Sequence, residues 1–303
     1  MNEEGWIFGV KSNFDCRGDS AQCKQILSNG LNPSVSRGGK TAVEKALEGG
    51  HKDTIVTLLE EDADVTTALI TSAERGCMND IQLLVKAGVD VDLKDSSGCT
   101  ALMKATQKNH LDIVMKLIDA NANKDLQDKY GETALIKATK KNCLEIVKVL
   151  IHSRADIENC NHSQYTALLM AAKYGHTEII KELIKAGAKV NHEDLDGNTA
   201  IIVAAKNNGD ANTIKELIKE AHKRTELSII NHQNKGGRTA MMMAARRGAD
   251  SIVQELLQAG ANREKQDKNG KTALQMAQDF DYMDTVNIIE QFLNYRDMNL
   301  PNK

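Results

Sequence analysis

Aromatic residues and prolines are scarce in this chain, which is 303 residues long with 3% aromatics and two prolines. Its core is therefore aliphatic, and few residues interrupt a helix. No apolar run approaches the roughly 20 residues that a membrane-spanning helix needs. We expect a helix-rich protein with no membrane association.

The N-terminus and the cysteines give no sign of secretion. The opening "MNEEGWIFG" is acidic with a brief apolar patch, unlike a secretory signal. The cysteines are irregularly spaced in a chain too large to need disulfide staples, so we expect reduced thiols and a cytoplasmic location. A net charge of −3 and a pI near 6.3 offer nucleic acid no general attraction.

A Thr-Ala pair recurs along the chain, with spacings of 26, 33, 33, 33, 33, 40 and 33 residues. A regular spacing in this range is the signature of a repeat architecture. The threonines are Thr41, Thr67, Thr100, Thr133, Thr166, Thr199, Thr239 and Thr272.

The same local pattern surrounds each pair. A turn such as "DSSG", "DKYG" or "DLDG" precedes it, in which Asp caps the turn and Gly closes it. The threonine is predicted to cap a short first helix. A second helix follows with apolar residues at i, i+1, i+4 and i+5, and "AGVDV", "AGAKV" and "AGANR" end it with a left-handed glycine. The apolar sets are Ile113/Val114 with Leu117/Ile118, Ile146/Val147 with Leu150/Ile151, and Ile179/Ile180 with Leu183/Ile184.

This pattern resembles the ankyrin-repeat family over almost the whole chain. The stretches "DLDGNTAIIVAA" and "YGHTEIIKELIKAGAKVN" match the family pattern best. Ala stands where the family usually has Pro, and the histidine of T-P-L-H is missing. The resemblance implies an all-α solenoid of about nine helix-turn-helix units with short β-hairpin-like finger loops.

We divide the chain into three parts on this basis. Residues 1–36 form a degenerate N-terminal capping repeat, 37–267 seven internal repeats, and 268–303 a C-terminal capping repeat. The period breaks twice, at a shortened finger near 61–66 and an insertion near 219–230. Terminal repeats are atypical because one face meets water. We interpret the aromatic residues at the two ends as plugs over the aliphatic core, namely Trp6, Phe8, Phe14, Phe280, Phe292 and Tyr295.

The sequence predicts no catalytic, metal or cofactor site. "SVSRGGKT" (34–41) resembles the end of a phosphate-binding loop, but its first glycine is Ser34 and no buried strand precedes it. Cys160 and His162 lie close together, but no second ligand pair stands at zinc-like spacing. Because the repeat pattern accounts for the residues, we expect a non-enzyme.

The resemblance implies that partners bind along a concave surface formed by turn tips and first helices. We take the fourth, seventh and eighth residues after each threonine as the exposed positions. Nine of these fifteen residues are basic and none is acidic, against about two basic residues expected by chance. The alternative is that lysines near helix C-termini merely offset the helix dipole. The residues are Lys104, Gln107, Lys108; Lys137, Lys140, Lys141; Met170, Lys173, Tyr174; Val203, Lys206, Asn207; and Met243, Arg246, Arg247.

Three tyrosines, Tyr130, Tyr165 and Tyr174, are the only aromatic residues between Asp15 and Asp279. All three fall at variable surface positions, and tyrosine is a preferred interface anchor. We therefore predict a partner-binding surface made of these tyrosines and the nine basic residues above. Its centre is expected at the tyrosines together with Lys140, Lys141 and Lys173.

The predicted partner is another protein with an acidic or phosphorylated segment, bound by a monomer. The alternative is nucleotide or single-stranded nucleic-acid binding on the same face, with tyrosine stacking on bases. The low pI disfavours that alternative. An Asn-, Lys- and Ile-rich, Pro-poor composition is typical of AT-rich genomes, so an effector acting in a host cytosol is a further hypothesis.

Overall fold

The computed structural model describes residues 41–61, 63–207, 210–223 and 227–297. The chain divides into two compact units, Met1–Asn123 and Lys124–Lys303. All regular structure in the described ranges is helical, with no strand. The predicted all-α fold is confirmed, and the finger loops are hydrogen-bonded turns.

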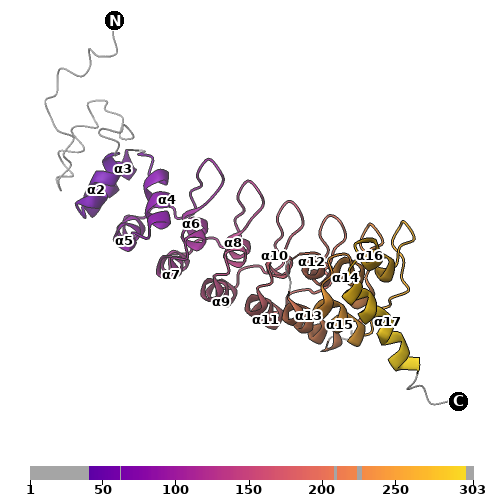
Figure 1. Ribbon diagram of the computed structural model, residues 1–303. Helices are drawn as coiled ribbons and strands as arrows, with labels where there is room; N and C mark the ends of the chain where they lie inside the picture. The colour runs from indigo at the N-terminus through magenta and orange to yellow at the C-terminus, as the bar shows by residue number, and fades with distance from the viewer. Residues whose placement is uncertain (1–40, 62, 208–209, 224–226, 298–303) are drawn as a thin grey trace, which may run out of the picture. The chain divides into compact units, whose positions relative to one another are not determined.

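The described part of the first unit, residues 41–61 and 63–123, contains three antiparallel helix pairs. The first helices α4 and α6 pack on each other, and the second helices α3, α5 and α7 form a second row (Figure 1). The helices are α2 (Ala42–Glu48), α3 (Lys52–Glu60), α4 (Thr66–Arg75), α5 (Met78–Lys86), α6 (Ala101–Gln107) and α7 (Leu111–Asp119).

The second unit, taken by itself, also has two layers of helices. Helices α8, α10, α12, α14 and α16 contact one another in succession, as do α9, α11, α13, α15 and α17 (Figure 1). The loops between pairs project beyond the same edge of this unit. The elements are α8 (Ala134–Lys140), α9 (Leu144–His152), α10 (Ala167–Tyr174), α11 (Thr177–Lys185), α12 (Ala200–Lys206), α13 (Ala211–Lys223), the 3₁₀-helix η2 (Leu227–Asn231), α14 (Ala240–Ala245), α15 (Asp250–Gln258), α16 (Ala273–Asp279) and α17 (Met283–Asp297).

Threonine caps most of the first helices, as predicted. Thr133 is extended, and its Oγ1 accepts the Ile136 N–H at 3.3 Å. Such a cap satisfies one of the amide hydrogens left without a partner in the first turn. Thr199 has the same backbone conformation but no side-chain cap bond. The capping threonines are Thr41, Thr100, Thr133, Thr166, Thr239 and Thr272.

The prediction for Thr67 is wrong. Helix α4 begins one residue earlier, at Thr66, and its N-cap Val65 has no side chain able to accept a hydrogen bond. The Thr66 N–H instead reaches the Asp64 carboxylate at 2.9 Å. In the other repeats a turn positions the capping threonine, and the 26-residue spacing has removed that turn here. Asp64 replaces the threonine as the side chain that accepts a hydrogen bond from the start of the helix.

The turn before each of the first helices α6, α8, α10, α12, α14 and α16 is held by one side chain. Asp128 Oδ1 accepts the N–H groups of Tyr130 and Glu132 at 2.8 and 2.9 Å, and Gly131 closes the turn at φ 75°. Neighbouring turns are linked through the backbone, since the His162 N–H donates to the Tyr130 carbonyl at 3.1 Å. The equivalent acceptors are Asp95, Asn161, Asp194, Asn234 and Asp267.

Burial differs between the two kinds of helix. In α12 every residue from Ala200 to Ala205 is buried, because α10 and α14 flank the helix and α13 covers it. The second helices bury one stripe, and its i, i+1 and i+4 members are fully enclosed, as Ile179, Ile180 and Leu183 show. The i+5 residues Ile118, Ile151 and Ile184 are only half-buried.

Several expectations fall wholly or partly outside the described residues. The predicted N-terminal capping repeat, residues 1–36, lies outside them together with Trp6, Phe8 and Phe14. The side chain of Tyr295 lies outside them as well. In the region of the insertion, α13 has 13 residues where α11 has 9, and η2 follows it.

Arg154 occupies a backbone position that favours glycine. Its φ is 63°, at the place where three other repeats have Gly88, Gly187 and Gly260, also with positive φ. Arg154→Gly should raise the free energy of unfolding by about 0.5–1 kcal/mol, because a residue with Cβ is strained there. Urea unfolding followed by circular dichroism measures this. Arg154→Ala is the control, and an equal gain from alanine would contradict the backbone explanation.

Candidate functional site

The fourth residue after each capping threonine is not a surface position, contrary to expectation. Met170, Val203 and Met243 are buried at this place, and Lys137 is only 3% exposed. Lys104 is half-buried. The position lies one turn into a helix that packs against neighbouring first helices, so its side chain points into the repeat stack.

Lys137 lies in an internal network of charges. Its Nζ is 2.6 Å from Asp128 Oδ2 and 3.1 Å from Glu132 Oε2, and Lys140 Nζ is 3.0 Å from Glu132 Oε1. Burial alone would raise the pKa of Asp128, but hydrogen bonds from Lys137 and from two backbone N–H groups lower it overall. Lys137 therefore braces the turn that Asp128 caps, and its ammonium is not available to a partner.

The first unit repeats this brace in a more open form. Lys104 Nζ lies 3.0 Å from Asp95 Oδ2. Burial raises the pKa of Asp95, but hydrogen bonds from Ser97, Cys99 and Lys104 outweigh it and lower the pKa to about 2. The ionised Asp95 thus stabilises the fold above the unfolded pKa of about 4, and this contribution is lost as pH falls toward about 2. Lys108, at the end of α6, is exposed and lies 3.3 Å from Glu74.

The seventh and eighth positions do reach the surface. Lys140 and Lys141 are exposed at the end of α8, and Lys173 is half-exposed at the end of α10. Lys206, Arg246 and Arg247 are exposed at the ends of α12 and α14. The second unit therefore carries cations at the C-terminal end of successive first helices.

Lys173 lies between two tyrosine rings. Its Nζ is 5.4 Å from the Tyr165 ring centroid and 5.8 Å from that of Tyr174. Burial, reinforced by Asp194, raises the pKa of Tyr165 to about 12. The phenol is therefore neutral and hydrogen-bonded to Asp194, whereas Tyr174 is 40% exposed.

Tyr130 stands apart at a turn tip. It is 60% exposed, and the Lys129 ammonium lies 5.2 Å from its ring centroid. The backbone bond to His162 joins its turn to the turn that precedes Tyr165. The structure thus brings Tyr165, Lys173 and Tyr174 into contact and places Tyr130 on the adjacent turn.

His176 links the ends of α8 and α10. Its ring stacks on Tyr174 with centroids 5.7 Å apart and hydrogen-bonds to the Lys140 carbonyl. Burial lowers the pKa of His176, and the hydrogen bond offsets only part of that effect. His110 makes the same contact in the first unit, with Nε2 3.1 Å from the Glu74 carbonyl. This histidine therefore has a structural role.

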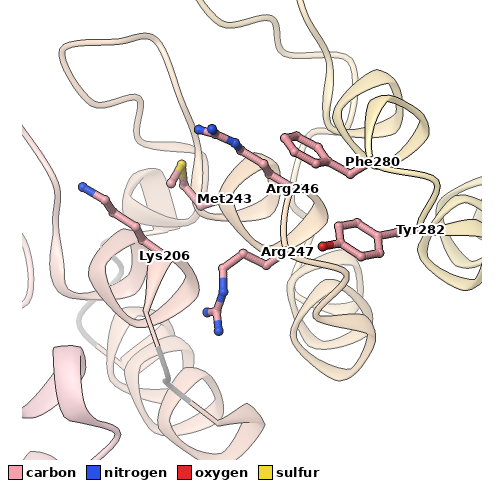
Figure 2. A pocket seen from close by; sticks show the side chains of 6 residues that line it. All are labelled: Lys206, Met243, Arg246, Arg247, Phe280 and Tyr282. Carbon is pink, nitrogen blue, oxygen red and sulfur yellow. The ribbon is translucent and has the colours of Figure 1, made fainter.

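A pocket of about 410 Å³ lies farther along the second unit (Figure 2). It is lined by Lys206, Met243, Arg246, Arg247, Phe280 and Tyr282. Phe280 is 49% exposed, so it does not act as the predicted plug over the core. Instead its ring stacks on Tyr282, with centroids 6.2 Å apart.

Among the described residues no group of three or more His, Cys, Asp or Glu side chains is arranged to hold a metal ion. In the same part of the chain no helix is long and apolar enough to cross a bilayer.

Comparison with known proteins identifies the architecture. A family profile described as ankyrin repeats (3 copies) matches residues 69–161, 151–227 and 205–302, which together make up more than half of the chain. The chain belongs to the ankyrin-repeat family. The crystal structure of the human ASB11 ankyrin repeat domain is similar, with a TM-score of 0.60 and 24% identity, covering 69% of this chain and 90% of that one. At this identity the likeness supports the fold alone.

Ankyrin repeats are generic protein–protein interaction modules and typically non-catalytic scaffolds. Function therefore depends on which side chains this ankyrin-repeat chain exposes. Sequence reasoning missed two features of that surface, the carboxylates that hold Lys104 and Lys137 and the pocket beside Phe280. The signal for the first was present, because Asp95 and Asp128 each stand nine residues before the lysine they bind.

The brace at Lys137 predicts a non-additive effect on stability. Lys137→Met should lower the free energy of unfolding by about 3 kcal/mol, because two carboxylates lose a buried counter-charge. Asp128→Asn/Lys137→Met copies the Asn161 and Met170 of the next repeat. Its loss of unfolding free energy should be at least about 1 kcal/mol smaller than that of Lys137→Met alone. Urea unfolding measures all three proteins.

Lys141→Met, at the C-terminal end of the same helix, is the matched control. Because Lys141 is exposed, its replacement should change stability by no more than about 0.5 kcal/mol. A Lys137→Met protein as stable as this control would show that the network has no bracing role.

Proposed function

We propose that this chain binds the acidic or phosphorylated segment of a partner protein through a tyrosine–lysine surface. That surface consists of Tyr130, Tyr165, Tyr174, Lys140, Lys141 and Lys173. The observation that carries the proposal is the Lys173 ammonium between two tyrosine rings at the exposed end of α10.

Charge supports an anionic partner. The whole chain has a net charge of −3, yet cations gather at the ends of α8 and α10. Lys140 retains 43% exposure of its side chain while it binds Glu132, so its ammonium remains accessible. Exposed positive charge is also present at the ends of α12 and α14, from Lys206, Arg246 and Arg247. In the first unit Lys108 provides an exposed positive charge. Lys104 and Lys137 are left out because their ammonium groups brace the turns.

The tyrosines supply the apolar part of the surface. Tyrosine is enriched among residues that dominate binding energy, because it offers a large contact area with few rotatable bonds. Tyr165 is fixed by Asp194, and Tyr174 is fixed by stacking on His176. A surface whose aromatic rings are already ordered loses little conformational entropy when a partner binds.

We also propose that the chain is a non-catalytic monomer that acts in a cytosol. A role as an effector in the cytosol of a host cell is one version of this proposal. The described cysteines support a reducing compartment, since Cys77, Cys99, Cys143 and Cys160 form no disulfide among themselves.

Charge reversal on the tyrosine–lysine surface tests the proposal. Lys141→Glu/Lys173→Glu should reduce partner capture from lysate about tenfold, because two favourable charge contacts become repulsive. Lys140 stays unchanged, since a glutamate there would face Glu132 and disturb the brace. Lys185→Glu/Lys189→Glu, two exposed residues beyond this surface, is the charge-matched control. Quantitative mass spectrometry of captured proteins measures the change, after thermal melts show equal stability.

The captured proteins should be rich in acidic segments, or lost after phosphatase treatment of the lysate. Equal capture by wild type and Lys141→Glu/Lys173→Glu would contradict the proposal, and so would equal losses in both variants. Capture abolished by nuclease would favour nucleic-acid binding instead, with bases stacked on the tyrosines.

A further inference from the structure

The pocket near the C-terminus of the second unit combines positive charge with aromatic surface. Its six lining residues, defined above and called the C-terminal pocket below, include three cations and no acidic residue. The cations come from the ends of α12 and α14, Met243 from within α14, and the two aromatic residues from the segment between α16 and α17 (Figure 2). Phe280 and Tyr282 form one side and Lys206 lies on the other.

Tyr282 creates the aromatic side by replacing a structural histidine. Its N–H donates to the Ala277 carbonyl, as the His176 N–H donates to that of Ala171, so the two residues are equivalent. The ring packs over Gly248, where a Cβ would lie 2.7 Å from Tyr282 Cδ1. Tyr282 thus has a fixed position that depends on Gly248 having no side chain.

The cations are also held in place. Arg247 Nη1 donates to the Ala205 carbonyl at 3.2 Å, and the Arg246 guanidinium lies 5.6 Å from the Phe280 ring centroid. Figure 2 shows Lys206 and Arg246 on the same side with Met243 between them, while Arg247 points the other way. The Lys206 contact with Asp196 is long, at 4.0 Å, and Asp196 is largely exposed. Lys206 and Arg246 are therefore positioned to meet an anion.

The pocket suits a ligand that is both aromatic and anionic. Its volume of about 410 Å³ lies within the range of small-molecule sites and exceeds what one inorganic anion fills. Phe280 is 49% and Tyr282 37% exposed, which leaves apolar ring surface in contact with water. A ring placed against Met243 and Phe280 would cover that surface, and an attached phosphate would lie near Lys206 and Arg246.

We infer that the C-terminal pocket binds a phosphorylated aromatic side chain, such as phosphotyrosine, of the partner segment. This inference rests on the proposed function and specifies one residue of the partner. The pocket and Lys173 are on neighbouring first helices α10, α12 and α14, which contact in succession. Helices pack about 8–10 Å apart and an extended chain advances about 3.3 Å per residue, so roughly six residues separate the two sites.

Three small probes distinguish the contribution of the aromatic ring to binding from that of the phosphate. They are N-acetyl-phosphotyrosine amide, N-acetyl-tyrosine amide and inorganic phosphate. Each is titrated into the full-length protein labelled with ¹³C at its methionine methyl groups, with the Met243 signal assigned from Met243→Leu. The phosphotyrosine amide should bind about tenfold more tightly than either half, because it alone engages both the rings and the cations.

Variants should separate the same two contributions. Arg246→Gln should weaken binding of the phosphotyrosine amide about tenfold and leave binding of the tyrosine amide unchanged. Phe280→Ala should weaken the phosphotyrosine amide to a similar extent and leave inorganic phosphate unchanged, and Phe280→Leu provides a second variant that retains bulk. Lys189→Gln, which removes one exposed charge away from the pocket, should have no effect.

Four results would overturn the inference. They are equal affinity for phosphotyrosine amide and inorganic phosphate, no shift of the Met243 methyl with any of the three probes, an equal loss in Lys189→Gln, and tighter binding of adenosine monophosphate, titrated as a fourth ligand, than of phosphotyrosine amide. The last result would assign the pocket to a nucleotide. Lys141→Glu/Lys173→Glu should bind the phosphotyrosine amide within about twofold of wild type, so failure of the tyrosine–lysine surface and failure of this pocket are distinguishable.

Discussion

The burial of each first helix between its neighbours determines what this protein can expose. In the second unit α12 contacts α10, α14 and α13, and every residue from Ala200 to Ala205 is buried. Burial of this apolar surface supplies most of the stabilisation that holds adjacent repeats together. It also limits variable side chains to the turn before the helix and to its last residues.

The arrangement of charge follows from that constraint. A lysine at the fourth position enters the repeat stack and needs a carboxylate, which the capping aspartate of the preceding turn provides for Lys104 and Lys137. A lysine three or four residues later is at the helix end and remains accessible. One turn of helix thus separates a structural lysine from one that is able to meet a partner, although the two look alike in the sequence.

Features fixed by local interactions were predictable. The threonine caps, the left-handed glycines and the buried stripe of the second helices depend on residues within a few positions of one another. Thr67 failed because the shortened repeat had lost the turn that positions it. The burial of Lys137 and the exposure of Phe280 depend on packing between repeats. A count of positions after each threonine carries no information on those contacts. The predicted partner-binding surface therefore included Lys137, which the structure buries.

The most direct test compares the reactivity of the lysines on one helix. Native protein is acetylated briefly with an N-hydroxysuccinimide ester, and modification at each lysine is measured by mass spectrometry. Lys140 and Lys141 should react quickly, and Lys137 more than about tenfold more slowly, because its ammonium is exposed only when the repeat opens. All three should react alike in urea. If Lys137 reacts as fast as Lys141 in the native protein, the first helix is not enclosed as described, and the separation of structural from accessible lysines is wrong.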